Sequence, residues 1–253
     1  MTPTSVSERT TIIVGASRGL GRGIATAFAH AGAPVIAVAR NGAGLAELAG
    51  NVGLDHAIQP EVADAGDPAV AGSLLDRYEP AAVILVAGAT PLVRPVQLQT
   101  WETFSLNWQT DVRIAFHWVR EALLKPLRPG TRVVVISSGA AVAGSPLSGG
   151  YAGAKATQRF ITAYAQDEAQ RAGLGIAFTA VLPRITPHGG VGRPAVRAYA
   201  ARAGRTEEEY LRQFGEPLTA EIAGAAIVEL VQKDADSLAP GYMLTGAGLQ
   251  DLS

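Results

Sequence analysis

Residues 13–25 of the chain read IVGASRGLGRGIA, an apolar strand end that runs into a glycine-rich turn and then a helix. Gly15 permits the tight turn, and Gly19 and Gly21 let the backbone approach a pyrophosphate group. The first N–H groups of the helix point outward and attract such an anion. A turn that only packs is the alternative, since the chain has 29 glycines. Its position between an N-terminal strand and a helix favours dinucleotide binding.

The end of the next expected strand predicts which dinucleotide binds. An Asp or Glu there would bind the adenosine ribose 2′-hydroxyl of NAD, but the sequence has Ala39 and Arg40. Arg40 and Arg18 could instead neutralise a 2′-phosphate through forked, charge-assisted hydrogen bonds. We therefore predict NADP(H) in preference to NAD(H). The alternative is that both arginines are solvated surface residues.

Short apolar runs alternate along the chain with longer amphipathic stretches. The expected strands are 11–14, 34–39, 81–87, 132–137 and 176–182, and the expected helices lie near 19–31, 67–78, 102–127, 151–172 and 219–232. Continuous apolar strands that alternate with helices indicate a parallel sheet covered on both faces. The sequence thus predicts a single α/β domain over residues 1–253. We expect a doubly wound Rossmann fold whose ligand lies at the carboxyl ends of the strands.

The composition narrows the class of partner. The chain of 253 residues is 48% hydrophobic, has a formal net charge of −1 and contains no cysteine. No uninterrupted apolar stretch reaches about 18 residues, and the N-terminus lacks the basic start and apolar core of a signal peptide. The four histidines show no metal-ligand spacing. We expect a cytoplasmic protein that acts on a small molecule, with no metal and with neither nucleic acid nor membrane as its partner.

Residues 148–160, SGGYAGAKATQRF, place a tyrosine four positions before a lysine. Tyr151 and Lys155 would share one helix face, so the lysine ammonium can favour the ionised form of the phenol. A phenol tuned in this way exchanges a proton efficiently with an alcohol or a carbonyl. Ser138, which follows an expected strand, would hydrogen-bond the substrate oxygen where negative charge develops. The alternative for the pair is an amphipathic helix start with a snorkelling lysine.

Taken together, these motifs resemble the short-chain dehydrogenase/reductase family. The resemblance covers nearly the whole chain, through 14-VGASRGLG-21, 85-LVAG-88, Ser138, the Tyr151 and Lys155 pair, Pro183, 214-FGEPLTAEIAGAAIVELV-231 and a closing Thr-Gly at 245–246. It implies an oxidoreductase that interconverts a carbonyl and a secondary alcohol, with Tyr151 as general acid/base. It also implies that Lys155 holds the nicotinamide ribose, and that helices 102–127 and 151–172 pack a homodimer or homotetramer.

The cofactor contacts of the family map onto a further set of positions. The resemblance implies contacts at Gly15, Ser17, Arg18, Gly19, Leu20, Gly21, Arg40, Glu61, Val62, Ala87, Gly88, Tyr151, Lys155, Pro183 and Ile185. Three features differ from the family pattern. Glu61 stands where an aspartate is usual on the adenine side, LVAG replaces Asn-Asn-Ala-Gly, and Arg184 follows Pro183 where glycine is usual. These differences indicate a divergent member.

The fourth catalytic position also departs from the family. An asparagine on the central helix usually helps to hold a water that links the lysine to solvent, and the best register puts Asp111 there. Asn107, one turn earlier on the same face, is the alternative. An ionised aspartate accepts hydrogen bonds but cannot donate them, and its charge competes for Lys155. We predict that Asp111 alters the pH dependence of turnover without abolishing it; otherwise it is a solvated or capped aspartate irrelevant to the chemistry.

Substrate choice is expected from the loops 89–95 and 139–150 and from a lid insertion at 184–216, because these segments follow strand ends. Their apolar side chains predict a small hydrophobic ketone or alcohol as substrate: Leu92, Val93, Val142 and Leu147. His188 within the insertion is interpreted as a polar loop residue rather than a catalytic one.

Two other functions are compatible with these residues. The same scaffold and cofactor could serve a non-redox epimerase, dehydratase or cyclase. The chain could also be a non-catalytic NADP(H)-binding regulator, although such a module has no need of Ser138, Tyr151 and Lys155 together.

Overall fold

The computed structural model describes residues 9–53, 58–187 and 189–252. Its strands form one sheet in the order β3-β2-β1-β4-β5-β6-β7-β8, in which β1 to β7 run parallel and β8 pairs antiparallel with β7. The strands are β1 (Thr11–Val14), β2 (Val35–Ala39), β3 (Ile58–Val62), β4 (Ala82–Leu85), β5 (Arg132–Ile136), β6 (Ala177–Pro183), β7 (Gly241–Thr245) and β8 (Gly248–Asp251). The predicted doubly wound fold is confirmed.

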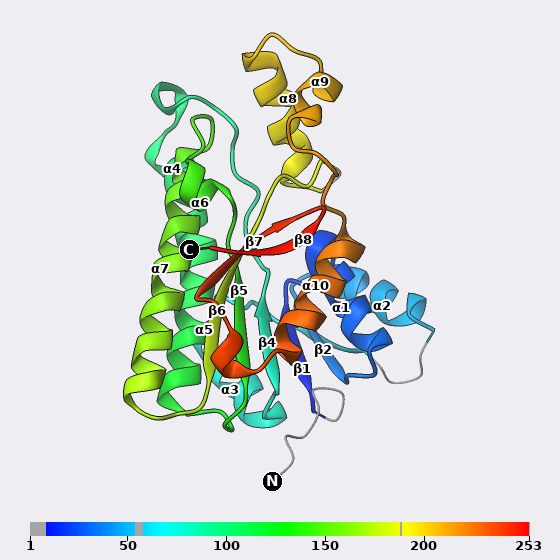
Figure 1. Ribbon diagram of the computed structural model, residues 1–253, viewed down its shortest axis with the longest axis vertical. Helices are drawn as coiled ribbons and strands as arrows, with labels where there is room; N and C mark the ends of the chain where they lie inside the picture. The colour runs from blue at the N-terminus through cyan, green and yellow to red at the C-terminus, as the bar shows by residue number, and fades with distance from the viewer. Residues whose placement is uncertain (1–8, 54–57, 188, 253) are drawn as a thin grey trace.

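Helices cover both faces of this sheet (Figure 1). The α-helices are α1 (Gly19–His30), α2 (Gly42–Asn51), α3 (Pro68–Tyr78), α4 (Trp101–Asn107), α5 (Arg113–Leu124), α6 (Ala140–Ala143), α7 (Gly149–Arg171), α8 (Gly192–Arg202), α9 (Glu207–Arg212) and α10 (Ala220–Gln232). Short 3-10 turns lie at η2 (Val96–Leu98) and η4 (Ala235–Ser237), and a π-helical turn, η3 (Trp108–Val112), separates α4 from α5.

Alternate residues of each central strand supply two separate cores. Ile13 of β1 packs with the side chains of α1, α2 and α10, whereas Ile12 and Val14 pack with those of α3, α5 and α7. The split follows because successive strand side chains point to opposite faces of the sheet. Phe28 anchors the first core and Trp118 the second, both about 1% exposed. Burying side chains of this size stabilises the fold by about 1.5–3 kcal/mol each.

The helix predicted over 102–127 is interrupted where it passes the sheet end. The π-helical turn η3 inserts between α4 and α5, so that prediction is correct in position but wrong in continuity. Such turns occur often at functional sites, because the altered hydrogen bonding re-aims side chains. Here the turn brings Asp111 inward, where 1% of the residue is exposed.

The segment predicted as a lid insertion, 184–216, carries α8 and α9. Both helices stand beyond the carboxyl ends of the strands, apart from the sheet and its two helical layers (Figure 1). The Tyr199 hydroxyl lies 2.6 Å from Ser145 Oγ and accepts a 3.0 Å hydrogen bond from the Leu147 N–H. These bonds connect α8 to the loop that precedes α7.

Candidate active site

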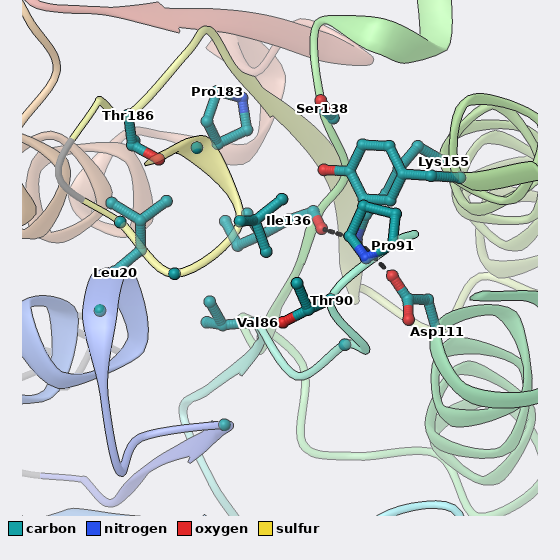
Figure 2. Close-up of a pocket in the computed structure, with 18 of the residues that line it drawn as sticks. Leu20, Val86, Thr90, Pro91, Asp111, Ile136, Ser138, Lys155, Pro183 and Thr186 are labelled. Carbon is teal, nitrogen blue, oxygen red and sulfur yellow. Dashed lines mark hydrogen bonds and ion pairs between the residues drawn. The ribbon is translucent and has the colours of Figure 1, made fainter. Parts of the chain in front are cut away.

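A cavity of about 1240 Å³ opens at the carboxyl ends of the strands. It lies where the strand order reverses between β1 and β4, the position at which open α/β sheets bind ligands. The predicted residues that line it are Gly15, Ser17, Arg18, Gly19, Leu20, Gly21, Arg40, Ala87, Gly88, Asp111, Ser138, Tyr151, Lys155, Pro183 and Ile185. Figure 2 shows Leu20 of α1 on one side of this pocket, with Asp111 and Lys155 on the opposite side.

The glycine loop meets its neighbours too closely for any side chain at two positions. A Cβ atom on Gly15, whose φ is +97°, would lie 2.6 Å from the Ala87 backbone nitrogen. A Cβ atom on Gly21 would lie 2.1 Å from the Gly15 carbonyl oxygen. The turn is therefore held against β4 and against the first turn of α1. It leaves the outward-pointing N–H groups of α1 at the edge of the cavity, where they can bind an anion.

We expect Gly15→Ala to weaken dinucleotide binding at least about 10-fold and to lower the free energy of unfolding by about 1–3 kcal/mol, because a non-glycine residue is strained at this φ. Titration calorimetry and chemical unfolding measure the two effects. Gly50→Ala is the matched control, since no atom lies within 4 Å of its Cβ position in α2. Unchanged affinity and stability in Gly15→Ala would contradict the close packing.

Two of the predicted cofactor-binding residues lie outside the lining of this cavity. Glu61 and Val62 are not among its lining residues; the segment Ala63 to Ala65 is. Glu61 accepts a hydrogen bond from the Tyr78 hydroxyl and forms a 3.2 Å ion pair with Arg77. Because β3 continues to Val62, the chain reaches the cavity only after the strand ends. The cofactor contacts at Glu61 and Val62 stay predictions.

Asp64, two residues after β3, is an acidic residue that lines the cavity. Its carboxylate accepts a 3.0 Å hydrogen bond from the Gly66 N–H, which closes a turn before α3. The sequence does contain a signal for it. In ADAGDP, residues 63–68, the turn-forming Asp64 precedes Asp67, which caps the N-terminus of α3.

Tyr151 and Lys155 lie on one face of the first turns of α7, as predicted. The Lys155 Nζ atom is 5.6 Å from the centroid of the Tyr151 ring. Ser137 Oγ donates a 2.7 Å hydrogen bond to the Lys155 carbonyl and so ties α7 to the end of β5. Ser138, the next residue, follows β5 with its Oγ 3.2 Å from the Ala140 N–H. Figure 2 shows Ser138 and Lys155 at the same end of the pocket.

Lys155 is buried among acceptors, with 5% of the residue exposed. Its Nζ atom lies 3.3 Å from the Ile136 carbonyl oxygen and 3.2 Å from Asp111 Oδ2 (Figure 2). Its third acceptor is Gln158 Oε1, at 2.9 Å. Of the two candidates for the family's asparagine position, Asp111 is thus the one whose side chain reaches Lys155. Sequence reasoning missed Gln158, which contacts both partners.

The other Asp111 oxygen is held by two donors. Oδ1 accepts hydrogen bonds of 2.8 Å from the Ala89 N–H and 3.3 Å from Asn107 Nδ2. Asn107, the alternative for the fourth position, therefore supports the aspartate instead of replacing it. A Cβ atom at Gly88 would lie 2.7 Å from Asp111 Oδ2, so this strand-end glycine leaves the space that the carboxylate fills.

The part of the cavity beside the loops predicted to select the substrate is largely apolar and aromatic. Two of the four predicted apolar residues, Val93 and Val142, line it, together with Pro91, Met243, Tyr210 and Phe214. Leu92 and Leu147 are not among the lining residues. Burial raises the pKa of the Tyr210 phenol, and the neighbouring Tyr199 adds to the rise, so Tyr210 stays neutral near physiological pH.

Arg184, which stands where the family usually has glycine, packs against Phe214, two residues after the end of α9. Its guanidinium carbon lies 5.8 Å from the centroid of the Phe214 ring, a cation–π distance.

His188 lies outside the described residues. Within the described ranges, no group of three or more His, Cys, Asp or Glu side chains is placed to hold a metal ion. No described helix is both long enough and apolar enough to cross a membrane.

A model of the short chain dehydrogenase family matches residues 9–194. An uncharacterized oxidoreductase of Mycobacterium tuberculosis is 36% identical over 141 residues, which are 53% of this chain and 52% of that protein. An uncharacterized short-chain type dehydrogenase/reductase of Sinorhizobium fredii is 30% identical over 210 residues, 81% of this chain and 36% of that protein. The chain therefore spans about half the length, or less, of these curated relatives.

Two solved structures share the whole fold. A 3-ketoacyl-(acyl-carrier-protein) reductase from Brucella melitensis, complexed with NADH, has a TM-score of 0.78 at 21% identity, over 96% of this chain and 98% of that chain. A provisionally assigned NAD(P)-dependent gluconate 5-dehydrogenase from Beutenbergia cavernae, with bound NADP, has a TM-score of 0.79 at 24% identity, over 94% of each chain. The family model and the fold together establish that the chain belongs to the short-chain dehydrogenase/reductase family of oxidoreductases.

Proposed function

We propose that the chain is an NADP(H)-dependent oxidoreductase that interconverts a carbonyl and a secondary alcohol on a small hydrophobic substrate. One observation carries the proposal. The glycine loop of α1 and the three reactive side chains Ser138, Tyr151 and Lys155 line the same cavity. A dinucleotide-binding loop and a proton-transfer group are therefore within reach of one bound substrate.

The residues present fit a nicotinamide dinucleotide. The crowded Gly15 and Gly21 positions leave bare backbone at the N-terminus of α1, suited to a pyrophosphate. Asp64 offers a carboxylate at the adenine end, and Pro183 and Ile185 line the opposite part of the cavity. When bound, the nicotinamide ring supplies or accepts the hydride.

Each reactive side chain then has a defined task. Tyr151 transfers the proton at its phenolic oxygen, and the buried Lys155 ammonium favours the ionised phenol. Ser138 donates a hydrogen bond to the substrate oxygen, which stabilises the negative charge that develops there. Nothing in a binding module would require these three groups in one cavity, and this supports catalysis over a purely regulatory role.

The preference for NADP(H) rests on Arg18 and Arg40. Both are exposed cationic side chains that line the adenosine end of the cavity. Neither forms an ion pair with a residue in the described ranges. Their guanidinium groups are thus available for a 2′-phosphate.

The double variant Arg18→Ala/Arg40→Ala is expected to bind NADPH about 10- to 100-fold more weakly, because charge-assisted hydrogen bonds are lost. Affinity for NADH, which lacks the 2′-phosphate, should change less than about 2-fold. Fluorescence titration with both cofactors measures the difference. Arg128→Ala serves as the control and should leave both affinities unchanged, since this exposed arginine pairs with Glu79 and does not line the cavity. Equal losses for both cofactors would refute the assignment.

Apolar lining supports a hydrophobic substrate, and we propose that residues 184–216 act as the lid over it. The aromatic rings of Tyr199, Tyr210 and Phe214 form a series beside the cavity, in which Tyr199 stacks on Tyr210 and Tyr210 meets Phe214 edge to face. The bond between Tyr199 and Ser145 holds this series over the loop before α7. A lid of this kind would exclude water from the reacting atoms.

A homodimer or homotetramer is also proposed. Large apolar side chains are exposed along α4, η3, α5 and α7: Trp101, Trp108, Phe116, Phe160 and Tyr164. The helices α4, α5 and η3 each contact α7, and exposed apolar side chains gathered on neighbouring helices typically mark a protein interface.

The function is tested by following NADPH absorbance in the near ultraviolet with a panel of apolar ketones, diketones and quinones. Oxidation of NADPH that depends on one of these substrates is the expected result. NADPH binding without oxidation on any substrate would overturn the redox proposal in favour of non-redox chemistry.

A further inference from the structure

The Lys155 ammonium has as many acceptors as it has N–H donors. An ammonium group carries three N–H bonds. Within the described residues, the Ile136 carbonyl, the Gln158 side-chain oxygen and the Asp111 carboxylate all lie within 3.3 Å of Nζ. The position of the ammonium is therefore set by the balance between these three groups.

Gln158 joins two of the partners. Its Oε1 accepts from Lys155 at 2.9 Å, and its Nε2 donates to the Asp111 main-chain carbonyl at 2.9 Å. The side chain is 2% exposed, so both bonds form out of contact with water. One buried amide thus links the catalytic helix α7 to the π-helical turn η3.

The contact between Lys155 and Asp111 is close but poorly aligned. The two atoms are 3.2 Å apart, yet Asp111 Oδ2 has no hydrogen-bond partner of acceptable geometry. A buried carboxylate oxygen is thus left with acceptor capacity beside an ammonium. The bonds to Gln158 and Ile136 direct the N–H groups elsewhere and prevent full pairing with the aspartate.

We propose that Gln158 is a positioning residue that keeps the Lys155 ammonium from pairing fully with Asp111, and so preserves the action of its charge on Tyr151. The inference rests on the proposed roles of Tyr151 and Lys155. Without the Gln158 oxygen, the ammonium turns toward Asp111 Oδ2. The carboxylate then neutralises it more completely, and the phenol ionises less readily.

Few other charged side chains lie near Lys155, Gln158 and Asp111. Tyr151 and Asp111 are the titratable groups that contact Lys155 in the described structure. Arg113, which follows η3, extends toward Gly66, and Arg184 packs on the Phe214 ring. Asp64 forms its turn at the adenine end. The Tyr151 titration therefore reports mainly on Lys155 and Asp111.

Two variants should shift that titration in opposite directions. Gln158→Met removes both amide bonds at similar volume, and the ionisation midpoint of Tyr151 should rise by at least about half a pH unit. Asp111→Asn removes the competing charge, and the midpoint should fall. In the reductive direction, which needs the protonated phenol, the alkaline limb of the pH–rate profile should move the same way as the midpoint in each variant.

Ultraviolet difference titration of tyrosinate measures the midpoint, with the same variant in a Tyr151→Phe background subtracted. This readout needs no turnover, so it remains informative if no substrate is reduced and the proposed function fails. Gln166→Met is the matched control on α7. It loses a 2.7 Å hydrogen bond from the Phe178 N–H but does not touch Lys155, and should leave the midpoint unchanged.

An unmoved midpoint in a folded Gln158→Met protein, or shifts of equal sign in both variants, would overturn the proposal. If Gln158→Met does not fold, Gln158→Leu is used instead. It also removes both amide bonds, so its midpoint should rise for the same reason. A midpoint equal to that of the wild type in this variant would likewise overturn the proposal.

Discussion

Replacing Tyr151 by Phe is expected to lower kcat for carbonyl reduction by about 10²- to 10⁴-fold, the range for loss of a positioned general acid. The phenyl ring keeps the packing against α7 and the cation–π distance to Lys155, so only the proton carrier is removed. Affinity for NADPH should therefore change by less than about 2-fold. Single-turnover reduction of the best ketone, followed with saturating NADPH, measures the chemical step.

A matched substitution on the same helix separates chemistry from packing. Tyr164 of α7 is 63% exposed, stacks on Phe160 and does not line the cavity, so Tyr164→Phe should retain full turnover. Turnover retained in Tyr151→Phe would mean that Tyr151 is not the proton donor and that another group in the cavity supplies the proton. Loss of NADPH binding together with turnover would instead indicate a folding or cofactor defect.

Local patterns in the sequence predict the catalytic pair because the pair is itself local. Tyr151 and Lys155 need only one helix to come together, and a spacing of four guarantees a shared face. The glycine loop is predictable for the same reason, since strand, turn and helix are consecutive. Apolar β-branched runs likewise identify β1, β2, β4, β5 and β6, which are buried on both faces.

Elements at the sheet edges are harder to predict. The sequence IQPEV of β3 has polar residues and Pro60, and it pairs on one side only, with β2. Without an apolar run, the end of this strand could not be located from the sequence, and the cavity-lining segment Ala63 to Ala65 was not predicted. The pair β7 and β8 was missed for a similar reason, because neither GYMLT nor GLQD contains a β-branched apolar run and β8 is partly exposed at the sheet edge.

The role of Gln158 could not be predicted from the sequence, because it depends on a contact between distant segments. Gln158 lies within the stretch that contains the catalytic pair, but its importance depends on a carbonyl of η3 that is 47 residues away. A π-helical turn changes the helical phase in a way that periodicity does not reveal. The sequence therefore predicts that Asp111 competes for Lys155, but not what restrains the competition.

Lys155→Met is expected to lower the free energy of unfolding by about 3–5 kcal/mol at neutral pH, because it leaves Asp111 as an uncompensated buried charge. The carboxylate is 1% exposed, and its remaining donors, Ala89 and Asn107, both bind the other oxygen. Chemical unfolding across a pH series measures the loss. The deficit should shrink as the pH falls, because protonation of Asp111 removes the buried charge.

Two further variants test whether the broken pair of Lys155 and Asp111 causes the loss of stability. Adding Asp111→Asn to Lys155→Met should restore most of the lost stability, since a neutral amide needs no counter-ion. Lys125→Met removes a lysine from an exposed ion pair with Asp76 and should cost no more than about 1 kcal/mol. A Lys155→Met protein as stable as the wild type, or a double variant no better than the single one, would mean that Asp111 is not held as an ion in the folded protein. The competition for Lys155, on which the pH dependence of Tyr151 is argued, would then have no source.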